Sequence, residues 1–237
     1  MPTAARGREY LESLLRDRKL DHTLSNGVPP ADLRWVMPTG IADLDARLEG
    51  GIPRGHVSEV IGPRSSGRLA ILTSALAGAT SRGEAVALID PLDMFDPVSA
   101  SATGVDFQRM LWVRGEASSS ARVSLSCEYG TLQKSLDCAV KALNIVLQAG
   151  GFGLVVLDLG EVAAQTIKRL PYTTWLRLHR VIEGSETACV LIGSEPIARS
   201  SGGVSVQLAA GQTARVVRAR KAESDHHVRV PLSAAAC

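Results

Sequence analysis

Residues 61–70 read Ile61-Gly62-Pro63-Arg64-Ser65-Ser66-Gly67-Arg68-Leu69-Ala70. The stretch follows an apolar run at 57–61 and opens a segment of helical character, which is where a phosphate-binding loop must lie. In such a loop, backbone N–H groups and the helix N-terminus converge on phosphate oxygens. A lysine contacts the β- and γ-phosphates, and a serine or threonine hydroxyl binds Mg²⁺. Here Arg68 takes the lysine position and Leu69 takes the hydroxyl position.

Both replacements change the chemistry of the loop. Arginine keeps the positive charge, but its planar guanidinium group is bulkier than an ammonium group and does not reach the same point by default. Leucine cannot bind a metal ion. The loop therefore indicates a nucleotide-binding ancestor and argues against a present-day hydrolase, so neither ATP nor Mg²⁺ is expected as a cofactor. The candidate residues of this degenerate Walker A motif are Gly62, Arg64, Ser65, Ser66, Gly67, Arg68 and Leu69.

Further landmarks surround the loop in a characteristic order. They are Met37-Pro38-Thr39-Gly40, Leu44-Asp45, Gly50-Gly51-Ile52-Pro53-Arg54-Gly55, Leu88-Ile89-Asp90, Asp96-Pro97-Val98 and Gly104-Val105-Asp106. Together they closely resemble the core of the RecA recombinases. The resemblance extends more weakly to 153–158, an apolar run ending in Asp158, which is similar to the second nucleotide motif of that family and is here a vestigial site residue.

The departures from the RecA pattern fall together on the catalytic positions. Leu92 stands where the resemblance implies a glutamate that orients the attacking water, and the nearest carboxylate, Asp93, is one residue off. Ser99 replaces a tyrosine that stacks on adenine, and Ser194 replaces a glutamine that senses the γ-phosphate. Phosphoryl transfer depends on positioning and electrostatics from such groups, so their joint loss should remove several powers of ten in rate. The sequence predicts a pseudo-ATPase.

The parts that contact DNA in recombinases are also reduced. RecA proteins carry a long glycine-rich loop after the sensor strand, whereas here only about ten residues, 194–203, precede the next apolar run. The first DNA loop, within 159–173, keeps Lys168 and Arg169 as candidate phosphate contacts. The C-terminal end is locally basic, which is also typical of a solvated strand. Any DNA binding is expected to be weak and independent of sequence; further candidate contacts are Arg215, Arg218, Arg220 and Lys221.

Composition limits the alternatives. With 237 residues and 45% hydrophobic content, the chain can bury one substantial core. Its 26 Lys and Arg against 24 Asp and Glu leave a net charge of +2, which does not by itself indicate a nucleic-acid binder. The four cysteines show no metal-ligand spacing with the histidines, so no metal site is expected. No window approaches the length of a membrane span, so we expect a soluble, cytoplasmic protein.

The N-terminal region separates from the rest. Residues 8–20 read as a helix with Leu11, Leu14 and Leu15 on one face, and the Pro- and Gly-containing segment 21–34 then breaks it. We therefore expect an arm and linker at 1–34 and a core domain at 35–237. The leucine stripe must be buried either on the chain's own core or on a neighbouring protein.

The core alternates between apolar runs and helical patterns, which predicts a mainly parallel sheet. The fold class is α/β, a RecA-like P-loop core with a central sheet flanked by helices and a C-terminal β-meander. Central strands, buried on both faces, are expected at 57–61, 85–89, 111–113, 153–157 and 188–192. Helices are expected at 66–82, 131–149 and 172–183, a serine-rich loop at 116–130, and the meander at 204–208, 214–218 and 228–230.

A RecA-like core with a disabled nucleotide site, shortened DNA loops and no separate C-terminal domain resembles the ImuA proteins of bacterial damage-induced mutagenesis. The resemblance implies a non-catalytic accessory factor of a translesion synthesis complex, associated with the nucleoid on DNA damage. Its implied partners are an ImuB-type inactive homologue of Y-family polymerases, an error-prone replicative-type polymerase and RecA. Two alternatives stay open: an active RecA/RadA-type ATPase in which Arg68 and Asp93 replace the missing groups, and a sensor that binds nucleotide without hydrolysis.

Overall fold

The computed structural model describes residues 35–115, 129–197, 202–209, 213–218 and 228–229. All of them belong to one compact unit, Leu33–Cys237. The arm expected at 1–34 and most of the expected serine-rich loop, 116–128, lie outside the described residues. Residues 129 and 130, which we assigned to that loop, already belong to a helix.

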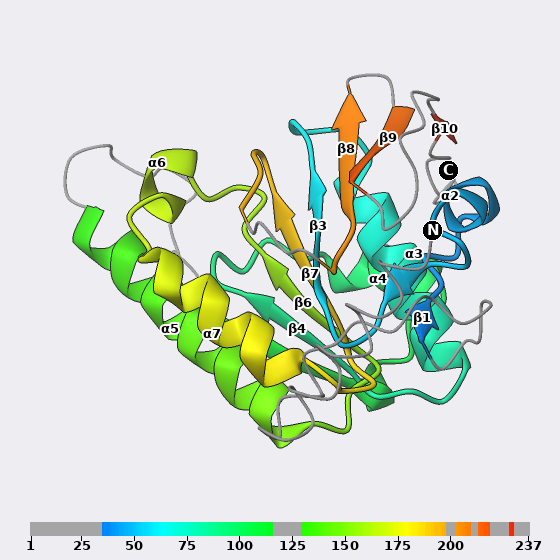
Figure 1. Ribbon diagram of the computed structural model, residues 1–237, viewed down its shortest axis with the longest axis horizontal. Coiled ribbons are helices and arrows are strands. Elements are labelled where there is room, and N and C mark those ends of the chain that lie inside the picture. Colours follow the sequence, from blue (N-terminus) through cyan, green and yellow to red (C-terminus); the bar gives the residue numbers. More distant parts are fainter. Residues whose placement is uncertain (1–34, 116–128, 198–201, 210–212, 219–227, 230–237) are drawn as a thin grey trace, which may run out of the picture. The chain divides into compact units, whose positions relative to one another are not determined.

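A mostly parallel sheet forms the middle layer (Figure 1). Its strand order is β10-β9-β8-β3-β7-β6-β4-β5. The parallel strands are β3 (Val57–Ile61), β4 (Val86–Asp90), β5 (Met110–Arg114), β6 (Leu154–Asp158), β7 (Ala188–Gly193) and β8 (Ser205–Ala209). Two antiparallel strands, β9 (Thr213–Arg218) and β10 (Val228–Arg229), extend the sheet beyond β8. A separate two-stranded sheet joins β1 (Val36–Met37) to β2 (Ile52–Pro53).

Helices cover both faces of the large sheet (Figure 1). One face carries α5 (Tyr129–Ala149) and α7 (Tyr172–Ile182), and the other carries α3 (Arg68–Ser81) and α4 (Pro97–Ala102). The remaining short helices are α2 (Ala42–Arg47), the 3-10 turn η2 (Phe107–Arg109) and α6 (Ala164–Ile167). Alternate residues of each central strand enter opposite cores, as in Leu88 and Ile89 of β4. The predicted α/β fold and β-meander are confirmed.

One strand is placed differently from the prediction. We expected 111–113 to be a central strand buried on both faces, but β5 pairs only with β4 and ends the sheet. Its Leu111 is 44% exposed. A short apolar run does not distinguish an edge strand from a central one, because the strand order depends on where the chain returns after β5.

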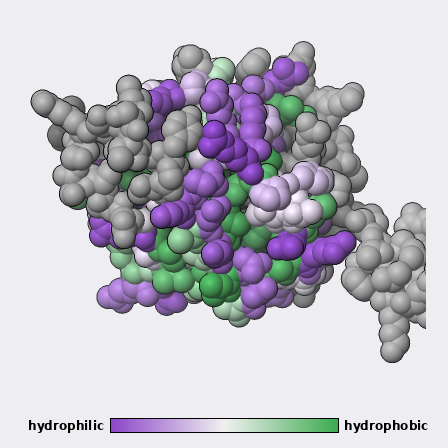
Figure 2. Space-filling model, turned by 90° about the vertical axis from the view of Figure 1, so that its left-hand side faces the viewer, coloured by the Kyte–Doolittle hydropathy of each residue, from purple (hydrophilic) through white to green (hydrophobic). Residues whose placement is uncertain are grey.

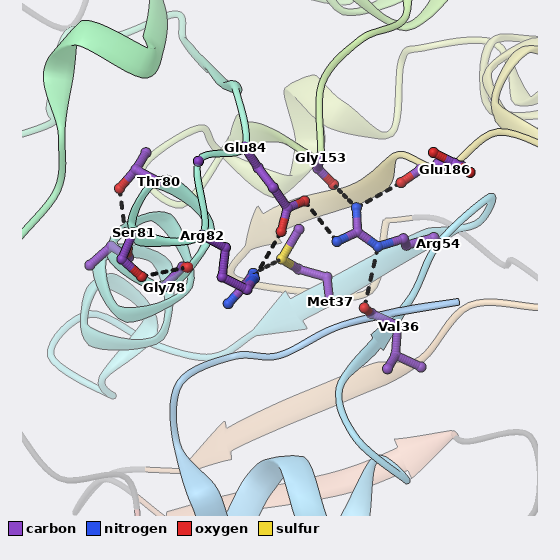
Figure 3. A network of polar contacts seen from close by, with 12 residues as sticks. Val36, Met37, Arg54, Gly78, Thr80, Ser81, Arg82, Glu84, Gly153 and Glu186 are labelled. Carbon is purple, nitrogen blue, oxygen red and sulfur yellow. Dashed lines mark hydrogen bonds and ion pairs between the residues drawn. The ribbon is translucent and has the colours of Figure 1, made fainter. Parts of the chain in front are cut away.

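A buried arginine organises the amino-terminal edge of the sheet (Figure 3). The Arg54 side chain, 8% exposed, pairs with the Glu84 carboxylate at 2.7 Å. Its guanidinium group also donates to the carbonyl oxygens of Val36, Gly153 and Glu186 at 3.3, 3.1 and 2.7 Å. Glu84, Gly153 and Glu186 lie just before β4, β6 and β7 respectively. One side chain therefore fixes the entry points of three strands, whose opposite ends carry the candidate site.

Candidate functional site

The degenerate phosphate-binding loop joins the carboxyl end of β3 to α3. Gly67 precedes the helix with a left-handed backbone (φ 98°), and no side chain caps the helix N-terminus. Gly62 is required by close packing, since a Cβ there would lie 2.7 Å from the Ser66 hydroxyl oxygen and 2.8 Å from the carbonyl oxygen of Leu208. The loop thus keeps the backbone form expected from its glycines and presents an uncapped helix terminus.

Glu161 bridges the two arginines of the loop. Its Oε2 lies 2.9 Å from Arg64 Nε, and its Oε1 lies 3.1 Å from Arg68 Nη2. Arg68 also donates through Nη1 to the carbonyl oxygen of Gly160 at 2.9 Å. The Arg68 side chain is 9% exposed and that of Glu161 is 28% exposed, whereas Arg64 is largely in solvent. Both positive charges of the loop are therefore engaged by one carboxylate of the same chain.

Glu161 was not among the site residues predicted from the sequence. It follows Asp158 by three residues, so it lies just beyond the end of β6. The carboxyl ends of parallel strands meet at one edge of a sheet, and that rule was the available signal. It was insufficient, because choosing the arginine partner required the strand order β3-β7-β6.

Asp158 lies beside the same group. Its Oδ1 accepts a hydrogen bond from the backbone N–H of Gly160 at 2.9 Å. Burial raises the pKa of the Asp158 carboxyl, and the negative charges of Asp90 and Glu161 act in the same direction. The Gly160 hydrogen bond and Arg68 oppose this rise in pKa without cancelling it. Within the described residues, no cluster of three or more His, Cys, Asp or Glu side chains is arranged to hold a metal ion.

The position that would supply a metal-binding hydroxyl is a leucine, and the hydroxyl groups of the loop belong to Ser65 and Ser66. Leu69 is 44% exposed on the first turn of α3. Ser66 is buried, and its hydroxyl has no hydrogen-bond partner within the described part of the chain. Ser65 is exposed and takes a positive φ of 58°.

The end of β4 holds the position expected for the catalytic glutamate. Leu92 there is partly buried and packs against the core formed with α5 and α7. The neighbouring Asp93 binds Arg114 through both oxygens, at 2.7 Å from Nε and 2.8 Å from Nη2. The hydrogen bond from Arg114 lowers the pKa of Asp93. The Arg114 guanidinium lies 4.4 Å from the centre of the Trp112 ring, so this pair belongs to a packed surface cluster.

The two remaining substituted positions have structural surroundings of their own. Ser99 lies in the first turn of α4, where the carboxylate of Asp96 accepts hydrogen bonds from the backbone of Val98 and Ser99 and from the Ser99 hydroxyl. Ser194 is exposed and directly follows β7.

A buried carboxylate on β3 binds residues on both sides of the shortened second loop. Glu59 is 3% exposed. Its Oε2 accepts from the backbone N–H of Ile197 at 2.9 Å, and its Oε1 accepts from the Ser205 hydroxyl at 2.9 Å. Residues on both sides of the connection after β7 are therefore attached to one side chain.

The structure places the predicted DNA contacts in different surroundings. Lys168 lies 2.8 Å from Glu195 in an exposed ion pair, and Arg169 is exposed next to it. Arg215 is exposed on β9. For Arg218 only the backbone is described, while Arg220, Lys221 and the arm residues Leu11, Leu14 and Leu15 lie outside the described residues. Their roles stay predictions.

Comparisons with known proteins agree with this architecture. The family model described as RecA N-terminal domain matches residues 31–124. The RecA protein of Thermus aquaticus is 31% identical over 160 residues, which are 66% of this chain and 45% of that protein. The RecA protein of Saccharopolyspora erythraea is 44% identical over 124 residues, 52% of this chain and 31% of that protein. The chain thus spans less than half of the length of these relatives.

The part of the chain that the structure describes contains no helix both long and apolar enough to cross a membrane. The family match covers the degenerate loop and the strands β3, β4 and β5. The sequence matches and the mostly parallel sheet flanked by helices together support a RecA-like superfamily for this chain.

Proposed function

We propose that this chain is a non-catalytic, RecA-like accessory factor of a translesion DNA synthesis complex, a pseudo-ATPase that acts through protein–protein contacts in damage-induced mutagenesis. The observation that carries the proposal is the Glu161 carboxylate bound to Arg64 and Arg68. Cationic groups stabilise the charge that develops on a transferred phosphoryl group. In this chain, both cationic groups already bind the carboxylate of Glu161.

The other catalytic positions support the same reading. Leu69 offers no oxygen to Mg²⁺, and Leu92 packs into the core where a carboxylate would have to orient water. Asp93, the substitute that an active ATPase would need, holds Arg114 with both oxygens. A nucleotide sensor would require Glu161 to leave both arginines. We therefore favour a protein that uses neither ATP nor Mg²⁺.

The partners of this function follow from the resemblance to the ImuA proteins. They are an ImuB-type inactive homologue of Y-family polymerases, an error-prone replicative-type polymerase, and RecA itself. The short connection after β7 and the Lys168–Glu195 ion pair favour at most weak, non-specific contact with DNA. The site of action would be the cytoplasm, on the nucleoid after DNA damage.

Measurement of ATP turnover tests the proposal. The purified chain should hydrolyse ATP no faster than its Arg68→Ala variant, with and without single-stranded DNA, in an assay in which a RecA protein serves as positive control. The double variant Arg68→Lys/Leu69→Thr should also stay at this background, because Leu92 still supplies no carboxylate. DNA-stimulated hydrolysis by the unmodified chain would contradict the proposal and favour the active ATPase.

A further inference from the structure

Glu161 has a role of its own in the loop. We propose that Glu161 is an internal anion that binds the two arginines of the phosphate-binding loop, and that its removal frees them as a latent site for oxyanions such as phosphate. The inference deepens the proposed function and rests on it in one respect, the absence of nucleotide turnover in the unmodified chain.

Electrostatics make Glu161 the counterion of the buried guanidinium. Arg68 is 8% exposed, and a buried charge is costly unless it is paired and hydrogen-bonded. Asp158, the other carboxyl group near Arg68, has a raised pKa because of its burial. Glu161 is partly open to water and contacts Arg68 directly, so it carries the compensating charge.

The geometry matches the binding of an external oxyanion. Guanidinium groups bind carboxylates and phosphates through the same directed hydrogen bonds. Here two guanidinium groups contact different oxygens of one carboxylate, beside a 14-residue helix whose N-terminus has no side-chain cap. An oxyanion and Glu161 must therefore compete for Arg64 and Arg68.

The segment that carries Glu161 is fixed to the loop by this contact. Gly160 packs so closely that a Cβ would lie 2.9 Å from Arg68 Nη1. Further along, the segment has a second ion pair, Lys168 with Glu195, which does not involve the loop. Glu195→Gln is therefore a matched control, because this variant also removes an ion pair of the same segment without changing the loop.

The experiment measures phosphate binding by isothermal titration calorimetry at low ionic strength. The unmodified chain and Glu195→Gln should bind inorganic phosphate equally weakly. Glu161→Gln should bind it at least about tenfold more tightly, a difference of about 1.4 kcal/mol, because two guanidinium groups become available to phosphate. Adding Arg68→Ala to Glu161→Gln should abolish this gain, which assigns the gained binding to the loop.

A thermal measurement covers the case in which Glu161→Gln folds poorly. Phosphate should then raise its melting temperature by several degrees more than it raises that of the unmodified chain or of Glu195→Gln, because phosphate replaces the lost counterion. Sodium chloride of equal ionic strength and the two reference proteins account for general salt effects.

Two results would overturn the inference. One is equal phosphate affinity in the unmodified chain and Glu161→Gln; the other is a destabilised Glu161→Gln that phosphate restores no better than chloride. The outcome is separable from the proposed function. ATP turnover by the unmodified chain contradicts the accessory role, whatever Glu161 does, whereas a failure of Glu161→Gln to gain phosphate binding leaves that role intact.

Discussion

At the scale of single residues, Arg68 stands at the lysine position of the phosphate-binding loop, and its positive charge is paired within the chain. The guanidinium group points to the end of β6, where it donates to Gly160 and pairs with Glu161. Burial there raises the pKa of Asp158, and the charges of Asp90 and Glu161 act in the same direction. The environment therefore disfavours the charge of Asp158, and the effect on stability can be measured.

Asp158→Asn should raise the thermal stability at neutral pH. The pKa of Asp158 is raised in the folded chain, so its charged form destabilises the fold. The stabilising effect of the bound proton is fully present below the unfolded pKa and is lost as pH rises through the folded pKa. Asparagine carries no charge and therefore avoids this loss of stability, while its Oδ1 can still accept the hydrogen bond from the Gly160 N–H. Calorimetric melting temperatures between about pH 4 and pH 8 test the change.

Asp93→Asn is the matched comparison, because the pKa of Asp93 is shifted in the opposite direction. The pKa of Asp93 is lowered, first by its hydrogen bond from Arg114, so the charge stabilises the fold above the unfolded pKa and the effect disappears as pH falls. Its replacement should leave the melting temperature at neutral pH unchanged or lower it slightly, because the pair is near the surface. A lower melting temperature for Asp158→Asn than for the unmodified chain at pH 7 would refute this account of the site.

At the scale of elements, the polar network around Arg54 connects several parts of the fold (Figure 3). Glu84 accepts from Arg54 and also from Arg82 Nε at 2.8 Å, while Arg82 Nη2 contacts the sulfur atom of Met37. The network thereby connects the end of α3, the small sheet and the first residues of three strands.

Arg54→Ala should destabilise the chain by about 3 to 5 kcal/mol, because it leaves a carboxylate and several carbonyl groups without their buried donor. Urea unfolding curves measure the effect. Arg109→Ala is the control: its ion pair with Asp106 spans 3.5 Å between half-exposed side chains, and its loss should cost less than about 1 kcal/mol. Equal losses for the two variants would show that Arg54 does not organise the edge.

The sequence predicted the elements of the described core well where apolar runs and breakers were clear. β3 is found at the predicted residues, and Gly83 and Gly150 follow α3 and α5 with a positive φ. The prediction of β5 as a central strand was wrong, because its place in the sheet depends on the order of the strands rather than on the strand itself. Glu161 and Glu59 were missed for a related reason: their partners are distant in the sequence and meet only across the sheet.

At the scale of the whole molecule, the described core offers few surfaces that announce a partner. On the side where α5, α6 and α7 lie, hydrophobic patches are separated by hydrophilic side chains (Figure 2). The exposed apolar residues of α5 and α7 include Ile145, Tyr172 and Leu176, and single exposed apolar residues are ordinary on a protein surface. Because both arginines of the nucleotide loop bind Glu161, the leucine-bearing arm predicted at 8–20 is our candidate for partner contact.

The arm yields the last prediction. A helix with Leu11, Leu14 and Leu15 on one face is suited to a groove that accepts anchors at i, i+3 and i+4. The triple variant Leu11→Ala/Leu14→Ala/Leu15→Ala should weaken binding to an ImuB-type partner, RecA or a second copy by several kcal/mol if the leucines are hot spots, with little change in melting temperature. Glu9→Ala/Arg16→Ala, on the opposite face of the predicted helix, should bind normally. Quantitative pull-down and melting curves decide between the two burial sites of the stripe: unchanged partner binding with a lowered melting temperature means that the leucines stabilise their own core, and the partner surface must then lie on another part of the chain.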